Sequence, residues 1–331
     1  MLPEIKSALV AGLYKDMDQD QWKELRRTGI GGSDVASVLG YSKYRGPLTL
    51  WMDKTGRAKP KDEDIAEENE AIAVGNWLEP FMREKVADYM AETMGLTVEV
   101  LYPGATYRSI DNPFMIYNPD GFLIVDGKLC LLEIKTGSSY VASQWGPDEL
   151  PDAYYCQVQH GMEVLGLDTC YVFALIGNRR ILRKVDYNEM FTEHMVNLER
   201  DFWETVKAND VLQAPLATEN DSTAVMELST PLKDVTADLT DHIFMIEEYT
   251  KIQDQIKDLE HAKDELKNRI IQAMGSCKTG VTGDYKVSLS IQGRDKYDMK
   301  QIKEAVPELV QQWTTRSEYP VLRIKNNRGK E

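Results

Sequence analysis

The chain has 331 residues, enough for one large domain or two ordinary ones, and its 42% hydrophobic and 28% charged residues describe a water-soluble globular protein. The formal net charge of −15 argues against attraction to nucleic acid over the whole surface, so a DNA-binding surface would have to be a local basic strip. The sequence shows no signal peptide and no long apolar span, which predicts no membrane association and a location in the cytoplasm.

The cysteines, at positions 130, 156, 170 and 277, form neither a CxxC pair nor a cluster. This spacing excludes a zinc ribbon and an iron–sulfur cluster. Three of them lie in apolar runs, where a buried thiol is the ordinary interpretation, and the whole set fits a reducing cytosol.

The first two thirds of the chain has the alternating patterns of a mixed α and β core. A charged stretch at 56–70 is predicted to be a loop or the frayed start of a helix. Apolar residues recur at helical spacing in 33–39, 48–54, 71–94, 154–165 and 189–207. Strand patterns occupy 97–102, 106–109, 114–117, 122–125, 128–135, 168–175 and 179–185.

A polar stretch at 208–230 suggests a linker, so we predict a core at 1–210 and an accessory extension at 211–331. In the extension, apolar residues at three- and four-residue steps predict a long helix over 239–274. Strands are expected at 286–291 and 321–324, on either side of a short helix at 299–306. The predicted fold class is therefore α/β (α+β): a mixed central sheet flanked by helices, followed by a long helix and a small β element.

The segment from Asp120 to Lys135 carries the most informative side chains. Residues i and i+2 of a strand share a face, so Glu133 and Lys135 project together while Ile134 points the other way. Asp120 can reach the same face if the strand beginning near Phe122 pairs with this one. Two carboxylates and a lysine at the end of a sheet suit a Mg²⁺ site for phosphodiester hydrolysis. The alternative is a solvated hairpin in which Glu and Lys are merely neighbours.

Two helices add polar groups to this set. Glu79 lies among apolar residues of the helix at 71–94, where an unpaired carboxylate would be costly, although it could also extend to the surface. Tyr154 and Gln157 are three residues apart and share one helix face. Both could hydrogen-bond a water or a phosphate, or they could form an ordinary solvent-facing pair.

A glycine-rich segment with two arginines offers a phosphate site. Arg26 and Arg27 precede three glycines and Ser33, at the start of a helix. Guanidinium groups, backbone N–H groups and a hydroxyl at a helix N-terminus suit a terminal phosphate. The GxxxxGK[ST] pattern of a P-loop is absent, so nucleoside triphosphate hydrolysis is not indicated. The competing interpretation is a glycine-rich turn with an N-cap serine.

Basic residues gather in two further places in this acidic chain. Arg179, Arg180, Arg183 and Lys184 form a strip that a DNA-tracking surface would need. A second basic group at 323–330 reads as a solvated tail.

The order of these motifs resembles the lambda-exonuclease-like, YqaJ-type viral recombinase family of the PD-(D/E)xK nuclease superfamily. The resemblance spans residues 22–175 and is carried by five short patterns in the expected order. They are Arg-x₆-Ser (Arg26, Ser33), G-x-x-x-E (Gly75, Glu79), P-D-G (119–121), E-x-K (Glu133, Lys135) and Y-x-x-Q-V-Q (154–159). A PD-(D/E)xK core with a C-terminal extension is thus the implied fold.

The resemblance implies a role for each matching residue. Asp120, Glu133 and the backbone carbonyl of Ile134 would hold Mg²⁺ (or Mn²⁺), and Glu79 would serve a second metal position, giving two ions per site. Lys135 would position the attacking water, with Gln157 beside it. Arg26 and Ser33 would receive the 5′-phosphate with Tyr154 nearby, and Arg27 could replace Arg26. No organic cofactor is implied.

The implied activity is 5′-to-3′ exonucleolytic digestion of linear double-stranded DNA, which leaves 3′ single-strand overhangs for phage-type recombination. The implied partners are a single-strand annealing protein and further copies of the chain in a ring, most simply a trimer. A phage or prophage origin in a bacterial cytoplasm follows. Two rivals stay open: a restriction-type DNA endonuclease, and a non-catalytic protein that binds DNA ends or a partner.

Overall fold

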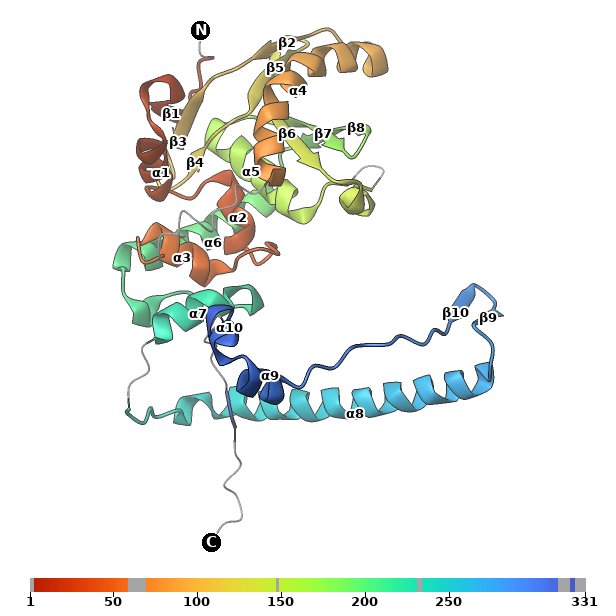
Figure 1. Cartoon of the computed structure of the whole chain (residues 1–331). Helices are drawn as coiled ribbons and strands as arrows, with labels where there is room; N and C mark the ends of the chain where they lie inside the picture. The colour runs from red at the N-terminus through yellow and green to blue at the C-terminus, as the bar shows by residue number, and fades with distance from the viewer. Residues whose placement is uncertain (1–2, 59–69, 147–148, 231–233, 315–321, 325–331) are drawn as a thin grey trace. The chain divides into compact units, whose positions relative to one another are not determined.

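The structure is a computed structural model that describes all residues except 1–2, 59–69, 147–148, 231–233, 315–321 and 325–331. It divides into two compact units, Met1–Thr230 and Pro231–Glu331 (Figure 1). None of the described helices is long and apolar enough to cross a membrane. The charged stretch predicted at 56–70 lies largely outside the described residues.

A five-stranded mixed sheet forms the centre of the first unit. Neighbouring strands are antiparallel except for the central β6–β7 pair, which is parallel and is joined by the crossover helix α5. The sheet order is β2 (Val98–Leu101), β5 (Gly121–Val125), β6 (Lys128–Gly137), β7 (Thr169–Ile176) and β8 (Arg179–Asp186). The predicted pairing of the strand near Phe122 with the Glu133 strand is confirmed, with Phe122 opposite Leu131.

A second, three-stranded sheet lies beside the first and contains a strand that the sequence patterns missed. Its order is β1 (Ala8–Leu13), β3 (Ala105–Ser109) and β4 (Ile116–Tyr117). The helices of the unit are α1 (Gln19–Arg27), α2 (Gly32–Val38), α3 (Pro47–Lys54), α4 (Glu70–Met94), α5 (Asp152–Leu165), α6 (Glu189–Ala208) and α7 (Ser222–Ser229). Short 3-10 turns cover Tyr14–Asp16, Ser139–Gln144, Val211–Gln213 and Glu219–Asp221.

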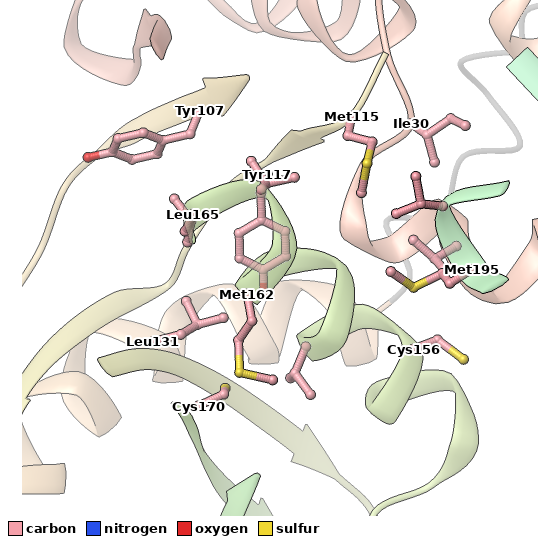
Figure 2. Close-up of a cluster of buried hydrophobic side chains, with 14 of the residues drawn as sticks. Ile30, Tyr107, Met115, Tyr117, Leu131, Cys156, Met162, Leu165, Cys170 and Met195 are labelled. Carbon is pink, nitrogen blue, oxygen red and sulfur yellow. The ribbon is translucent and has the colours of Figure 1, made fainter. Parts of the chain in front are cut away.

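Alternating residues of β6 divide between two hydrophobic cores, as expected for a strand covered on both faces. Leu132 and Ile134 pack with residues of α4, whereas Leu131 packs with residues of α5 and α6. Figure 2 shows the core that contains Leu131, where Tyr117 of β4 lies close to Met162 and Leu165 of α5. Glu133 and Lys135, two and four residues beyond Leu131, therefore project from the α5 face of the sheet.

The segment predicted to be a linker at 208–230 is instead part of the first unit. The buried carboxylate of Asp221 accepts hydrogen bonds from the backbone N–H of Thr49 (2.8 Å) and from its hydroxyl (2.6 Å), close to the start of α3. Ala224 of α7 is buried in the same core. The first unit thus runs to Thr230 instead of the expected residue 210, because a few buried contacts outweigh the polar composition.

The second unit contains the predicted long helix, α8 (Ile243–Met274), after a 3-10 turn at Thr240–His242. The predicted strand at 286–291 appears as β10 (Tyr285–Ser288), and its partner is β9 (Thr279–Thr282). The expected strand at 321–324 is wrong for its described part, since Leu322, Arg323 and Ile324 have no regular structure. Two short helices, α9 (Met299–Ala305) and α10 (Pro307–Gln312), follow β10.

A fully buried His–Glu pair ties α5 to α6. The Nδ1 atom of His160 lies 2.9 Å from a carboxylate oxygen of Glu199, and its Nε2 atom lies 3.0 Å from the carbonyl oxygen of Ile116. Both ring nitrogens face acceptors. The Nε2–H group donates to the carbonyl of Ile116, and one further proton must therefore lie between Nδ1 of His160 and the carboxylate of Glu199. Burial would lower the pKa of His160, but Glu199 raises it overall, while burial raises the pKa of Glu199.

This proton predicts a pH dependence of stability. Above the ordinary His pKa of about 6.5, the unfolded chain loses the proton that the folded pair retains, so the free energy of unfolding should fall by up to about 1.4 kcal/mol per pH unit. The loss ends when the pH passes the raised pKa of the folded pair. In Glu199→Gln, an amide N–H can donate to neutral His160 and no extra proton is held. Urea unfolding between pH 7 and 9 measures how steeply the free energy of unfolding falls with pH. This fall should be smaller for Glu199→Gln than for the wild type, and an equal fall would contradict the shared proton.

Candidate active site

Three of the predicted residues meet on the α5 face of β6. The Nζ atom of Lys135 lies 2.6 Å from Oε1 of Glu133, whose side chain is only 2% exposed. Asp120 directly precedes β5 and turns towards β6, where its Oδ2 accepts a 2.7 Å hydrogen bond from the backbone N–H of Ile134. The hairpin β5–β6 thus brings the two carboxylates and the lysine together as the strand pairing predicts.

Helix α5 supplies the other two predicted groups. Lys135 donates a 3.0 Å hydrogen bond to the side-chain carbonyl of Gln157, and the amide of Gln157 donates to Oε1 of Glu133. The ring of Tyr154, one turn earlier, has its centre 5.1 Å from Nζ of Lys135. Gln157 therefore lies where it was predicted, and Tyr154 lies against the lysine.

Glu79 reaches the same region from α4, together with an arginine that sequence reasoning missed. Arg83, one turn after Glu79, forms an ion pair with it and donates a 2.6 Å hydrogen bond from Nε to the backbone carbonyl of Asp120. Its guanidinium lies 4.0 Å from the centre of the Tyr102 ring. The i, i+4 spacing of Glu79 and Arg83 was a usable signal. Arg83 fixes both a carboxylate and the turn that carries Asp120.

Tyr117 is a second residue that the sequence did not single out. Its hydroxyl donates a 2.5 Å hydrogen bond to Oε2 of Glu133, the carboxylate oxygen that Lys135 and Gln157 leave free. A Cβ atom added to Gly32 of α2 or Gly161 of α5 would overlap its ring. The two glycines therefore allow the tyrosine to lie between α2 and α5 and to orient the carboxylate.

The electrostatics of this group reflect crowded carboxylates. Burial and the neighbouring Glu133 raise the pKa of Asp120 well above its ordinary value. Burial also raises the pKa of Glu79. Burial alone would lower the pKa of Lys135, but Glu133 and Asp120 raise it. Three carboxylates thus lie near the two cations Lys135 and Arg83.

The donor set fits a hard divalent cation in its chemistry. Mg²⁺ prefers oxygen ligands, keeps several of its waters and needs only one or two carboxylates from the protein. Asp120 and Glu133 supply such oxygens, and the carbonyl of Ile134 lies between Glu133 and Lys135 in the chain. Among the described residues, no three His, Cys, Asp or Glu side chains are placed to hold a metal ion together. The ions, and the assignment of Asp120, Glu133, Ile134 and Glu79 as their ligands, stay predictions.

A second polar group, called here the Asp34 cluster, is formed by Arg26, Ser33, Asp34, Arg45 and Lys54. Nη2 of Arg26 donates a 3.0 Å hydrogen bond to the hydroxyl of Ser33. Asp34 is buried and pairs with Arg45 and with Lys54 at 2.7 Å. Arg26, Arg45 and Lys54 line a cavity of about 200 Å³ together with Trp22, Lys23, Arg27 and Asp53.

The Asp34 cluster distinguishes the two adjacent arginines. Arg26 turns to Ser33, while Arg27 pairs with Glu24 at 2.6 Å. Burial would raise the pKa of Asp34, but Lys54, Arg45 and Arg26 lower it to about 2. Burial lowers the pKa of Lys54. Because three cations share one carboxylate, the cavity has an excess of positive charge. Arg45 and Lys54 gave no sequence signal because they belong to no recognisable motif.

Contacts between helices connect the two groups. A Cβ atom added to Gly32, which directly precedes Ser33, would lie 3.0 Å from Cγ of Gln157. The start of α2 therefore touches the helix that carries Gln157 and Tyr154. The Asp34 cluster and the Glu133 group are neighbours in the fold although they are about 100 positions apart in the chain.

The basic strip lies on β8, an edge strand of the five-stranded sheet. Arg179 and Arg180 are exposed, and the Arg180 guanidinium lies 4.7 Å from the centre of the Tyr89 ring. Arg183 donates a 2.6 Å hydrogen bond to the carbonyl of Gly146. These residues border a cavity of about 500 Å³. The basic residues at the chain end lie mostly outside the described residues.

The mixed sheet carries Asp120, Glu133 and Lys135 on a β-hairpin and receives Gln157 from the crossover helix, which is the arrangement that the order of the sequence motifs predicted. Residues 21–168 match the YqaJ-like viral recombinase domain. Over 315 residues the chain is 30% identical to the uncharacterised protein YqaJ of Bacillus subtilis strain 168, which covers 92% of this chain and 93% of that protein. The chain therefore belongs to the YqaJ family, as its motifs predicted.

Two solved structures are similar in part. They are crystal structures of LHK-Exo, an alkaline exonuclease from Laribacter hongkongensis, one of them in complex with dAMP. Their sequence identities to this chain are 18% and 19%, with TM-scores of 0.47 (the dAMP complex) and 0.44. Each match covers 57% of this chain and 93% of the other.

Proposed function

We propose that this protein is a Mg²⁺-dependent 5′-to-3′ exonuclease of linear double-stranded DNA. It would act in a bacterial cytoplasm and leave 3′ overhangs for phage-type recombination with a single-strand annealing protein. The observation that supports this proposal best is the adjacency of two unlike groups. One has the carboxylates and lysine suited to phosphodiester hydrolysis, and the other has an excess of positive charge suited to a terminal phosphate.

The residues of the first group have separable roles in such a reaction. Asp120, Glu133 and the Ile134 carbonyl would hold one Mg²⁺, and Glu79 would serve a second. Bound Mg²⁺ would supply Lewis-acid stabilisation of charge on the phosphate and a lowered pKa for water. Lys135 donates two of its three ammonium protons to Glu133 and Gln157, and the third would be donated to a water or a phosphate oxygen. Arg83 holds Glu79 and the Asp120 turn in place.

The second group would determine which DNA end is used. The guanidinium of Arg26 and the hydroxyl of Ser33 are already in contact, so they present converging donors to a 5′-phosphate. Arg45 and Lys54 add positive charge to the same cavity. A 5′-phosphate held here would place the first internucleotide linkages near the Glu133 group, since α2 touches α5.

The deciding experiment compares three substrates in Mg²⁺: a linear duplex with 5′-phosphates, the same duplex with 5′-hydroxyls, and a covalently closed circle. We expect rapid digestion of the first, at least tenfold slower digestion of the second, and no cutting of the circle. Efficient cutting of circles would support the endonuclease alternative. Binding of DNA ends without digestion would support the non-catalytic alternative. A parallel reaction with EDTA removes Mg²⁺ and tests whether digestion requires the metal.

The same assay decides between the two arginines. Arg26→Ala should lose the preference for 5′-phosphorylated ends, because its guanidinium contacts Ser33. Arg27→Ala removes another guanidinium that lines the same cavity, and this variant is the comparison. It should keep the preference, since the Arg27 side chain pairs with Glu24 and does not contact Ser33.

Tyr117 gives a finer prediction about the hydrolytic group. Tyr117→Phe keeps the ring between the two glycines but removes the hydrogen bond to Glu133, so the turnover rate should fall roughly tenfold, the equivalent of about 1.4 kcal/mol. The Mg²⁺ concentration for half-maximal activity should rise. Tyr107→Phe is a matched control, because the buried hydroxyl of Tyr107 has no hydrogen-bond partner within the described part of the chain. Equal activity of the two variants would contradict the role given to Tyr117.

A further inference from the structure

Helix α8 of the second unit exposes an apolar stripe that no described part of this unit covers. The helix has 32 residues, and none of them is buried. The large apolar side chains of the stripe are 41–69% exposed: Tyr249, Ile252, Ile256, Leu259, Leu266 and Ile270. A contiguous apolar surface of this kind on a water-soluble protein marks an interaction site.

The spacing of the stripe identifies what it fits. Its residues follow one another at steps of three, four, three, seven and four, and Lys263 divides the seven into four and three. This is an average period of 3.5 residues, so the stripe stays on one side only if the helix winds around a partner helix in a left-handed supercoil. Tyr249, Ile256, Lys263 and Ile270 take the first core position of successive heptads, and Ile252, Leu259 and Leu266 take the second.

The residues beside the stripe favour a partner helix over a flat domain surface. A helix that packs on a domain has a wider apolar face, which extends into the positions flanking the seam. Here most flanking positions are polar: Glu248, Gln253, Gln255, Glu260, Lys267 and Arg269. A narrow apolar stripe flanked by charged and amide side chains is the pattern of a coiled coil, in which the stripe forms the seam between the two helices.

We propose that α8 pairs with α8 of a second copy of this chain as a parallel, in-register, two-stranded coiled coil. Isoleucine at the first core position with leucine at the second favours two parallel strands, and this chain has that combination at Ile256 with Leu259. Leu266 and Ile270, four residues apart in successive heptads, also have leucine at the second position and isoleucine at the first. The seam is self-complementary, since each apolar layer then meets its own copy.

Charge and Lys263 both agree with this arrangement. In parallel pairing, the flanking contacts between copies are Glu248 with Gln253 and Gln255 with Glu260, so no like charges face each other there. A single lysine in the core costs stability but specifies register, because any shift places it against an apolar layer. Pairing through α8 is independent of the proposed hydrolysis, which uses only residues of the first unit.

The mass of the full-length protein tests the pairing. In Ile256→Asp/Leu266→Asp, two carboxylates enter the seam, and the mass by sedimentation equilibrium should fall to half that of the wild type. His261→Asp/Asn268→Asp is the matched control, with the same new residues on the opposite face, and its mass should not change. An unchanged mass of the seam variant would overturn the proposal, and a fall to one third would overturn the two-stranded state. DNA digestion by both variants reports separately on the proposed function.

Cys277 tests the orientation without a new residue. It is exposed just beyond the end of α8, whereas the other three cysteines are buried. The helix is about 48 Å long at 1.5 Å per residue, so antiparallel pairing would hold the two copies of Cys277 far apart. A short bis-maleimide should link the wild type and the control variant into covalent dimers. It should not link the seam variant, which is expected to be unpaired, or Cys277→Ser, which lacks the exposed thiol. Failure to cross-link a wild type that is dimeric by sedimentation would overturn the parallel arrangement.

Discussion

Replacing Lys135 with methionine should reduce the rate of DNA digestion roughly a thousandfold, the loss typical when a charged group that stabilises a transition state is removed. Methionine keeps most of the volume of the side chain but cannot donate a hydrogen bond. Of the two cations that face the three carboxylates, only Lys135 hydrogen-bonds both Glu133 and Gln157. Single-turnover digestion of a 5′-phosphorylated duplex at saturating enzyme measures the effect on the chemical step.

Lys128→Met is the control for this variant. Lys128 is exposed at the other end of the same strand, so its replacement should leave the rate within about twofold. Circular dichroism must show that Lys135→Met retains its folded signal. If that variant digests DNA at the rate of the control, Lys135 has no part in hydrolysis and the assignment of the active site to the Glu133 group fails with it.

Replacing Asp34 with asparagine should lower the free energy of unfolding by about 3–5 kcal/mol, the usual cost of leaving one member of a buried ion pair without its partner. The side chain of Lys54 is only 2% exposed, and Asp34 is the carboxylate it contacts, at 2.7 Å. Urea unfolding monitored by fluorescence measures the change. Asp53→Asn should cost less than about 1 kcal/mol, because the side chain of Asp53 is 41% exposed and its ion pairs are long, at 3.8 and 3.9 Å.

A second substitution separates charge from packing in this cluster. Lys54→Met removes the stranded cation, so Asp34→Asn/Lys54→Met should recover much of the stability lost in Asp34→Asn. Acid supplies an independent check. The pKa of Asp34 is lowered to about 2, so its contribution is complete above the ordinary Asp pKa and is lost as the pH falls towards 2. A double variant no more stable than Asp34→Asn would show that the ion pair is not the source of the loss.

Local patterns were sufficient for the sheet and for its motif residues. The period-two alternation of β6 correctly placed Glu133 and Lys135 on one face, and the predicted hairpin brought Asp120 beside them. Gln157 followed because helical spacing places it on the inner face of α5. These predictions succeeded because each depends on the geometry of one element or one turn.

The residues that were missed depend on contacts between distant segments. Tyr117 reads as an ordinary strand residue until Gly32 and Gly161 approach its ring from two helices. Arg45, just before α3, and Lys54, at the end of α3, acquire meaning only when the fold brings them to Asp34. The boundary near residue 210 failed for the same reason, since Asp221 docks on Thr49 across more than 170 positions. Composition does not report such contacts.

The tyrosine held between two glycines also sets a length. On one side it touches the helix that begins at the proposed end-binding group, and on the other it is bonded to the carboxylate of the proposed hydrolytic group. In the proposed function, one aromatic ring would thus be a rigid spacer between the place where a strand end is held and the place where a linkage is broken. An enzyme with such a fixed gauge should release products of one uniform size, whatever the base sequence.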